Sequence, residues 1–254
     1  MRNVFSTKRV LAKTVSSSAR LLQATPLAGQ RILAYHSIGN SVDGDINGIY
    51  SLSRTEFVNQ IDSVRQFAED HGFSFVPFGT PKEKTICITF DDGYSDVLSV
   101  VAPILSNFRI PFHVFVSPLK SETNDARYLS RAETKEIQSI SHATVGAHGY
   151  SHTSLTSIPN EQAMIELGKS KSVLEDLLSS PVESMSYPYG HTNEHITHMV
   201  QQVGFKYAAC SKWGFVAENS HPLMQSRIDM WAGDTQRDVQ LKLYGAWNWF
   251  HRFT

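Results

Sequence analysis

The chain has 254 residues, of which 41% are hydrophobic and 19% are charged, which is enough for one barrel-sized domain. The formal net charge of -1 provides no overall attraction to polyanions, so we expect no nucleic-acid partner. Cys87 and Cys210 are the two cysteines, and each lies in an apolar run where a thiol behaves as a small hydrophobe, which excludes a disulfide framework.

The first part of the chain is basic. No acidic residue precedes Asp43, whereas lysine or arginine occurs at positions 2, 8, 9, 13, 20 and 31. Lys, Arg, Thr and Ser interrupt the hydrophobic residues there, so the continuous apolar stretch of about 7 to 15 residues that a secretory signal needs is missing. We predict a leader over residues 1–29, which is a polar arm, an amphipathic helix on an anionic membrane or a transit peptide. The expected location is the cytoplasm, either free or peripheral at a membrane.

Short β-rich runs alternate with amphipathic helical patterns through residues 30–254, which we assign to one domain. The predicted strands are residues 31–36, 85–91, 112–117, 144–148, 184–189, 206–211 and 223–230. The predicted helices are residues 56–70, 94–108, 131–140, 161–178, 193–203 and 234–249. Seven strands alternating with helices at this spacing predict an α/β fold of right-handed β-α-β units with a parallel sheet, open or closed into a barrel.

Two adjacent carboxylates, Asp91 and Asp92, end the second predicted strand, and His148 and His152 follow the fourth. Parallel α/β folds place their chemistry at the carboxyl ends of strands, so we expect these four side chains to converge. Each pair alone has a simpler explanation, a helix cap for the aspartates and chance spacing for the histidines. Together they supply three ligands for a divalent metal and a spare carboxylate base, a combination that indicates metal-assisted hydrolysis.

Polar residues end other predicted strands as well. They are His36 after the first strand, Tyr187, Pro188, Tyr189 and Gly190 at the end of the fifth, and Arg227 and Asp229 in the seventh. In a closed parallel sheet these positions meet at the same mouth, so they are candidates for the same site.

The surrounding sequence resembles the polysaccharide deacetylase family, the NodB-homology or carbohydrate esterase family 4 domain. The resemblance rests on Thr89-Phe90-Asp91-Asp92-Gly93 and on Gly146-Ala147-His148-Gly149-Tyr150-Ser151-His152-Thr153-Ser154-Leu155. It extends to residues 32–36, 52–57, 185–190 and 227–229. The resemblance implies a distorted, incomplete (β/α) barrel of seven strands, in agreement with the count made from the pattern.

The resemblance also implies separate roles for the polar residues. Asp92, His148 and His152 would bind the metal, for which Zn²⁺ is the expected ion, and Asp91 would be the general base. A metal-activated water would attack the acetyl carbon, while a backbone amide near Tyr189 or Gly190 would stabilise the oxyanion. The segment from Tyr187 to Gly190 is accordingly expected to contact the carbohydrate substrate.

Two departures from the family pattern concern the remaining catalytic groups. The general acid is usually a histidine in a C-terminal motif, and this chain has no convincing copy of that motif. His36 follows an apolar strand near the N-terminus, as in the branch where that strand has moved to the front, and we predict that it is the acid; the alternative is a hydrogen bond within the barrel mouth. Ser186 stands where many members have the arginine that steadies the base, and we predict that Arg227 substitutes for it.

The leading functional hypothesis is removal of the acetyl group from an N-acetylated sugar in a glycan or glycan precursor. Alternatives are an O-acetyl esterase, a catalytically impaired glycan-binding barrel, and a non-haem iron oxygenase that uses the same two histidines and one carboxylate. The missing export signal favours a nucleotide-linked or lipid-linked sugar over secreted chitin, xylan or peptidoglycan. The oligomeric state cannot be read from the sequence.

Overall fold

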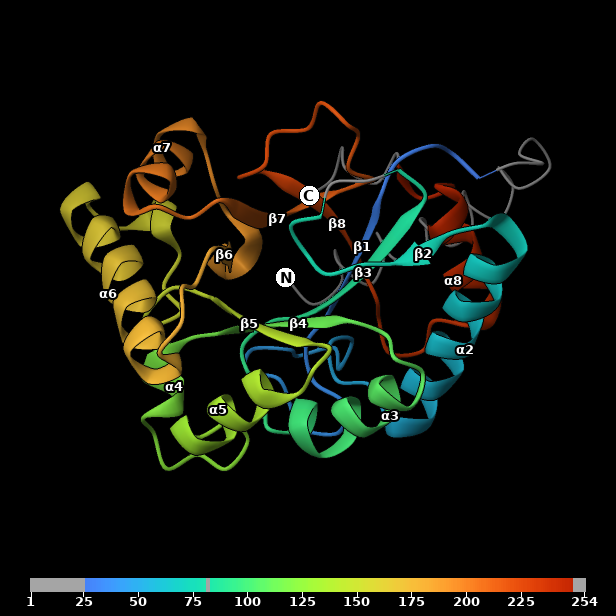
Figure 1. The fold of residues 1–254 in the computed structure, drawn as a ribbon, viewed down its shortest axis with the longest axis horizontal. Helices are drawn as coiled ribbons and strands as arrows, with labels where there is room; N and C mark the ends of the chain where they lie inside the picture. The colour runs from blue at the N-terminus through green and yellow to red at the C-terminus, as the bar shows by residue number, and fades with distance from the viewer. Residues whose placement is uncertain (1–25, 81–82, 249–254) are drawn as a thin grey trace.

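The computed structural model describes residues 26–80 and 83–248 (Figure 1). The predicted leader at residues 1–29 lies almost entirely outside the described residues. The strands are β1 (Arg31–Tyr35), β2 (Ser74–Phe75), β3 (Thr85–Phe90), β4 (Phe112–Val116), β5 (Ala143–Ala147), β6 (Ser184–Ser186), β7 (Tyr207–Trp213) and β8 (Gln225–Asp229). The α-helices are α2 (Arg54–His71), α3 (Ala102–Asn107), α4 (Pro118–Ser121), α5 (Arg131–Ser139), α6 (Asn160–Leu178), α7 (Glu194–Val203) and α8 (Gln236–Tyr244).

Seven strands form a closed parallel ring. They follow the order β3-β4-β5-β6-β7-β8-β1, and β1 closes the ring by pairing with β3 in the register Arg31↔Ile86 to Tyr35↔Phe90. The short β2 is an additional strand that pairs with the start of β3. The ring is uneven, because β5 and β6 pair only at Ala147↔Met185 and the β7–β8 register shifts. The predicted seven-stranded, distorted (β/α) barrel is confirmed.

Alternation along the strands explains where polar side chains enter the barrel. In β3, Ile86, Ile88 and Phe90 belong to the main hydrophobic core, whereas Cys87 belongs to a smaller cluster with Ile32 of β1 and Phe115 of β4. Because side chains alternate along a strand, residues 89 and 91 share the face of residue 87, which points into the barrel. The barrel interior is therefore apolar around residue 87 and becomes polar at residues 89 and 91, where β3 ends.

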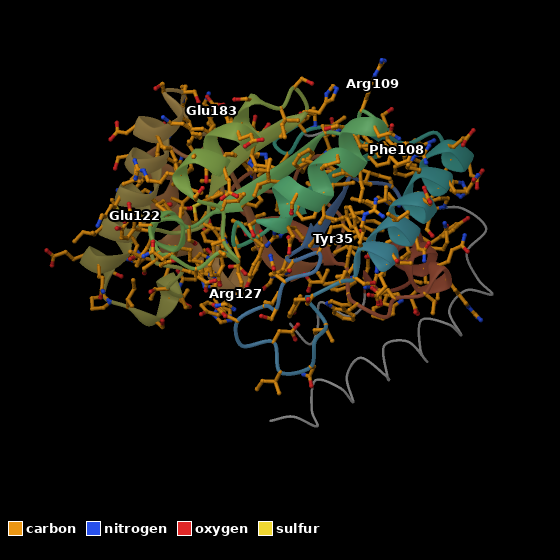
Figure 2. All side chains as sticks on the ribbon, turned by 90° about the horizontal axis from the view of Figure 1, so that it is seen from below. Tyr35, Phe108, Arg109, Glu122, Arg127 and Glu183 are labelled. Carbon is orange, nitrogen blue, oxygen red and sulfur yellow. The ribbon has the colours of Figure 1, made fainter. Side chains whose placement is uncertain are left out.

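Helices surround the ring, with α2 beside α8 on one side (Figure 1). Three of them begin with a capping box, formed by Ser53 and Glu56 for α2, Ser130 and Glu133 for α5, and Thr235 and Asp238 for α8. Figure 2 separates the two ends of the barrel: Arg109 and Glu183, just before β4 and β6, lie at one edge, and Arg127, in a loop after β4, lies toward the other. Within residues 26–80 and 83–248, we find no helix with the length and apolar character needed to cross a membrane.

Three predicted elements differ from the structure. The helix predicted over residues 234–249 is α8, which ends at Tyr244 because Gly245 adopts a left-handed conformation with φ 90°. The helix predicted over residues 94–108 starts as a π-helical turn, Val97–Val101, and continues as α3. Pro103 in the first turn of α3 has no N–H group to donate, which disrupts regular α-helical bonding at this point. The strand predicted over residues 184–189 stops at Ser186, because the chain turns into a 3₁₀ turn, Pro188–Gly190.

Candidate active site

Asp91 and Asp92 occupy the turn that follows β3. The Asp91 N–H donates to the carbonyl oxygen of Tyr35 at 2.9 Å, which continues the β1–β3 ladder by one bond. Asp92 then adopts a left-handed conformation with φ 71°, and Gly93 follows with φ 73°. The two residues are 3% and 5% exposed, and their side chains have different partners. A left-handed backbone is uncommon for a residue other than glycine, and in this site it occurs at Asp92, at His152 with φ 62° and at Tyr189 with φ 59°.

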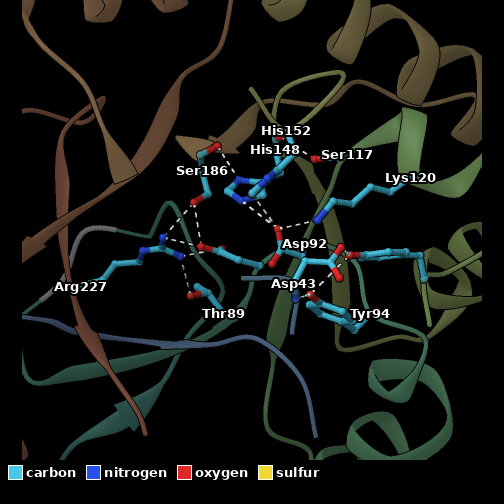
Figure 3. A network of polar contacts seen from close by, with 12 residues as sticks. Asp43, Thr89, Asp92, Tyr94, Ser117, Lys120, His148, His152, Ser186 and Arg227 are labelled. Atoms are coloured by element: carbon cyan, nitrogen blue, oxygen red, sulfur yellow. Dashed lines mark hydrogen bonds and ion pairs between the residues drawn. The ribbon is translucent and has the colours of Figure 1, made fainter. Parts of the chain in front are cut away.

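The three predicted metal ligands lie together, with all three ligand atoms within 4.8 Å of one another (Figure 3). Asp92 Oδ1 is 2.8 Å from His152 Nε2 and 3.6 Å from His148 Nε2. A carboxylate and two imidazoles at this spacing suit a divalent ion that keeps open positions, so the residues fit the metal implied by the sequence. Burial lowers the pKa of His148 to about 4, which keeps its imidazole in the neutral form that binds metals.

A backbone carbonyl sets the orientation of His148. Its Nδ1 lies 2.9 Å from the carbonyl oxygen of Ser186 in β6, so an Nδ1–H group donates there and Nε2 faces Asp92. This arrangement fixes both the ring and its tautomer, as the outer partners of metal-bound histidines do. Burial would raise the pKa of Asp92, but the hydrogen bond and charge of His152 and the charge of Lys120 hold this pKa well below its usual value.

The loop from His148 to His152 is held by Glu166 of α6. Its Oε2 accepts hydrogen bonds from the backbone N–H groups of Tyr150 and Ser151, at 3.1 and 2.9 Å, and its Oε1 accepts one from the Ser151 hydroxyl at 2.8 Å. Gly149 has φ +66°, and a Cβ there would come within 3.0 Å of Pro188. The loop is therefore fixed by a carboxylate and by close packing, and these determine where His152 lies.

Asp91 points toward β8 and forms a buried ion pair with Arg227. Arg227 Nη1 and Nη2 donate to Asp91 Oδ1 and Oδ2 at 2.8 and 2.6 Å, and Arg227 Nη2 also donates to the Ser186 hydroxyl at 2.9 Å. The Ser186 hydroxyl lies 3.2 Å from Asp91 Oδ2. Burial would raise the pKa of Asp91, but the Arg227 charge and hydrogen bonds lower it to about 2. The guanidinium therefore occupies the position beside Asp91 that the sequence assigned to it.

Asp91, Asp92, His148, His152 and Arg227 line a cavity of about 620 Å³ at the mouth of the barrel. His36, directly after β1, lies in this lining with Asp91, Arg227 and Asp229. Its ring centroid is 4.5 Å from that of Tyr50, and its Nδ1 is buried with no hydrogen-bond partner among the described residues. Burial raises the pKa of Asp229, although the charge of His36 partly opposes this. The predicted acid thus faces the same space as the predicted base.

The segment predicted to contact substrate divides into two halves. Tyr189 and Gly190 line the cavity, and Tyr189 is 59% exposed with its ring centroid 4.8 Å from that of His152. Tyr187 is fully buried and donates its hydroxyl to the Leu223 carbonyl oxygen at 2.9 Å, while Pro188 is buried beside Gly149. The side chains of Tyr187 and Pro188 therefore shape the turn and do not face the cavity, because β6 ends at Ser186 and not at residue 189 as predicted.

Sequence reasoning missed two parts of the site. One is Lys120 of α4, whose Nζ lies 3.2 Å from Asp92 Oδ1. The other is the loop after His36, where residues 42–47 form a wall of the cavity with Ile46 70% exposed. Both follow the carboxyl end of a strand, β4 and β1 respectively, so the strand-end rule applied to every strand would have included them.

A parallel (β/α) barrel with an Asp-His-His cluster beside a second aspartate belongs to the class of metal-binding barrel hydrolases. The model of the polysaccharide deacetylase family matches residues 78–208, just over half of the chain. The chain belongs to this family. Relatives in sequence are YxkH of Bacillus subtilis, 24% identical over 134 residues, and poly-β-1,6-N-acetyl-D-glucosamine N-deacetylase of Staphylococcus aureus (strain N315), 22% identical over 222 residues. The matches cover 53% and 80% of this chain, and 47% and 73% of those proteins.

Other similarities extend this result. Chitin deacetylase 1 of Cryptococcus neoformans is 27% identical over 124 residues, which are 49% of this chain and 25% of that protein. The first relatives thus match this chain over half of their own length or less. Among solved structures, the deacetylase PplD of Streptococcus pyogenes has a TM-score of 0.73 at 20% identity, covering 86% of this chain and 99% of that chain. IcaB from Ammonifex degensii has a TM-score of 0.69 at 21% identity, covering 87% and 100%. These structures share the fold of this protein.

Proposed function

We propose that the protein is a metal-dependent hydrolase that removes the acetyl group from an N-acetylated sugar unit of a glycan. The observation that carries the proposal is the division between the adjacent aspartates. Asp92 lies with the two imidazoles, whereas Asp91 forms a bidentate pair with Arg227 and faces the same cavity. Neighbouring carboxylates in different surroundings are suited to different roles, one as a ligand and the other as a base.

Asp92, His148 and His152 would hold the metal, for which we propose Zn²⁺, because zinc in catalytic sites takes imidazole and carboxylate ligands. When bound, such an ion polarises a carbonyl oxygen and lowers the pKa of a water molecule. Asp91 accepts the proton of the water that attacks the acetyl carbon. Arg227 keeps the Asp91 carboxylate ionised and fixed in direction, which supports an active enzyme over a catalytically impaired barrel.

The remaining steps concern the leaving amine and the oxyanion. The amide C–N bond breaks to give acetate and an amine, which needs a proton, and we assign its donation to His36 because that side chain lines the cavity beside Asp91. The Gly190 N–H already donates to the Tyr187 carbonyl oxygen at 2.7 Å. Of the two backbone amides expected to stabilise the oxyanion, we therefore propose that of Tyr189.

The charges of the cavity support an uncharged glycan as the substrate. Arg227 is the one arginine or lysine among the described lining residues, and both of its terminal nitrogens bind Asp91. Asp43, Asp45 and Asp229 add carboxylates to the same lining. Apart from the proposed metal ion, a diphosphate would meet carboxylates and no unpaired cation in this lining, so we favour a glycan chain over the nucleotide-linked sugar expected from the sequence. β-1,6-linked N-acetylglucosamine, on which the Staphylococcus aureus relative is named to act, is the first substrate to test.

The test combines metal content with acetate release. We expect bound zinc and acetate release from β-1,6-linked or β-1,4-linked N-acetylglucosamine oligomers, and none above background from UDP-N-acetylglucosamine. Asp92→Ala should lose both metal and activity, whereas Asp91→Asn should keep the metal and lose activity. Asp62→Asn, on the exposed face of α2, is the matched control. Acetate release at the normal rate by the Asp92→Ala protein would overturn the proposal, and release from O-acetylated xylan alone would replace it by an esterase.

We propose that the protein is cytoplasmic and that its leader, residues 1–29, contacts a membrane peripherally. Its basic residues support this, although they lie outside the described residues. Fractionation of the full chain and of a protein lacking residues 1–20 tests it: we expect membrane association only in the full chain, and equal solubility of the two proteins would refute it.

A further inference from the structure

The Lys120 side chain reaches the candidate metal centre from α4. Its Nζ lies 3.2 Å from Asp92 Oδ1, and the two side chains are 17% and 6% exposed, so the ion pair is largely withdrawn from water. The same oxygen lies 2.8 Å from His152 Nε2 and 3.6 Å from His148 Nε2. One ammonium group and two imidazoles thus converge on a single carboxylate oxygen (Figure 3).

This oxygen is the one that faces both histidine ligands. A divalent ion held by Asp92, His148 and His152 would therefore bind the oxygen that Lys120 already contacts. Two cations on one largely buried carboxylate oxygen repel each other strongly, because little water lies between them to screen the charges. The ammonium and the metal ion are thus alternative partners for Asp92 Oδ1.

The surroundings of Lys120 provide a second place for its charge. Its Nζ lies 4.5 Å from the ring centroid of Tyr128 and 5.8 Å from that of Tyr94, and these two rings are stacked 4.9 Å apart. The Tyr128 hydroxyl donates to Asp43 Oδ2 at 2.5 Å. An ammonium that leaves Asp92 thus stays beside two aromatic faces and near a carboxylate, where a cation is stabilised.

We propose that Lys120 is a positioning residue, which serves as the counter-ion of Asp92 in the metal-free protein. When a divalent metal binds, it displaces the Lys120 ammonium toward Tyr128 and Asp43. Lys120 thereby lowers the metal affinity of the centre and stabilises the protein without metal. The proposal rests on the metal site of the proposed function. It goes beyond that function because it identifies Lys120, a residue of this chain, as a group that competes with the metal for Asp92.

The contacts of Asp43 connect this competition to the substrate cavity. Asp43 lies in the loop that lines the cavity, and its backbone N–H donates to the Tyr94 hydroxyl at 3.2 Å. Its carboxylate also pairs with Arg127 at 2.6 Å. If Asp43 stabilises the displaced Lys120 ammonium, removing the Asp43 charge makes it harder for a metal to displace Lys120 from Asp92. Asp43 then raises metal affinity only while Lys120 is present, since coupling between two groups requires both of them.

The experiment measures the zinc dissociation constant by competition with a chromogenic chelator, together with thermal unfolding of the metal-free protein. Lys120→Met should bind zinc about tenfold more tightly than the natural protein and unfold at a lower temperature without metal. Lys120→Arg keeps the charge and should bind zinc within about twofold of the natural protein. Lys171→Met is the control, because Lys171 is 16% exposed, pairs with Glu175 and lies on α6 away from the metal ligands. It should leave the zinc dissociation constant unchanged.

Asp43→Asn completes a double-mutant cycle with Lys120→Met. Alone it should weaken zinc binding by about threefold, and in the Lys120→Met protein it should have no effect. If Lys120→Met binds zinc no more tightly than the natural protein, the proposal is wrong, because Lys120 then supports the ligand set. If Lys120→Met does not fold, Asp43→Asn decides alone: unchanged or tighter zinc binding overturns the proposal. A natural protein that binds no zinc overturns the proposed function as well, whereas zinc binding unaffected by these variants overturns only this inference.

Discussion

Arg227 and Asp91 form a bidentate ion pair across the interior of the barrel, with Nη1–Oδ1 and Nη2–Oδ2 distances of 2.8 and 2.6 Å. They come from β8 and from the end of β3, which are not neighbours, because β1 pairs with both strands and lies between them. Both side chains are 5% exposed. The pair therefore connects two sides of the ring at the level of the candidate site.

Removing the guanidinium should destabilise the protein strongly. Arg227→Met leaves the Asp91 carboxylate buried without its ion-pair partner, so we expect the free energy of unfolding in urea to fall by about 3–5 kcal/mol. Adding Asp91→Asn to the same protein should recover part of the loss, because the unpaired charge is gone. Lys206→Met breaks the exposed ion pair with Glu183 and should leave the free energy of unfolding almost unchanged, because water screens these charges. Equal stability of Arg227→Met and the double variant would contradict this explanation.

Glu166 should control metal affinity without touching the metal. Glu166→Ala leaves the Tyr150 and Ser151 N–H groups without their acceptor, so the loop that carries His152 loses its support. We expect the zinc dissociation constant to rise about 10- to 100-fold, as when outer partners of ligands are removed. Glu161→Ala, at an exposed position of the same helix, is the control and should bind zinc normally. Normal zinc binding by Glu166→Ala would show that the loop holds its shape without this carboxylate.

The sequence predicted the elements that repeat and the residues that lie at strand ends. Apolar runs and helical periodicity located seven strands, and the rule that chemistry collects at carboxyl ends brought Asp91, Asp92, His148 and His152 to one mouth. The structure places the ligand atoms of three of them within 4.8 Å of one another, although these residues follow β3 and β5, which are far apart in the sequence. Local patterns were sufficient here because neighbouring parallel strands end at the same level.

The strand-end rule marks the regions where loops approach the site, but it does not say which side chain of a loop makes a contact. Lys120 reaches Asp92 because the chain turns into the four-residue helix α4 directly after β4, and no periodicity marks such a short helix. Tyr187 was expected in the cavity because the sequence placed it at the end of a strand predicted to reach residue 189, whereas β6 stops at Ser186 and the Tyr187 ring is buried. Both depend on where a strand ends to within one or two residues, which is the least certain feature of a sequence pattern.

Gly190 should tolerate no side chain. It has φ +66°, and a Cβ there would lie 2.1 Å from the Cβ of Ser211 and 2.5 Å from its backbone nitrogen. Gly190→Ala should therefore displace the turn that carries Tyr189, lowering both the free energy of unfolding and acetate release. Gly168→Ala is the matched control: it lies inside α6 with nothing within 4 Å of the added Cβ, and should stabilise the protein by about 0.5–1 kcal/mol. Urea unfolding of both variants checks the contrast, and a stable, active Gly190→Ala protein would contradict it.

His113 should make the protein sensitive to acid. It is 2% exposed inside the barrel, where Nε2 lies 2.8 Å from the Ser184 hydroxyl, and burial lowers its pKa to about 3. The unfolded chain has a histidine pKa near 6.5, so below that pH the unfolded state binds a proton that the folded state does not. The stability contributed by neutral His113 is thus complete above about pH 6.5 and is lost as the pH falls toward 3, at up to about 1.4 kcal/mol per pH unit.

The variant His113→Gln removes this titration. Between pH 7 and pH 5 its free energy of unfolding in urea should fall by about 2 kcal/mol less than that of the natural protein, whatever its stability at pH 7. The comparison of slopes cancels the carboxylates and metal ligands, which titrate in both proteins. His198→Gln, on the exposed side of α7 beside Gln202, should keep the natural slope. Parallel curves for His113→Gln and the natural protein would mean that the buried imidazole is protonated in the folded state as readily as in the unfolded chain.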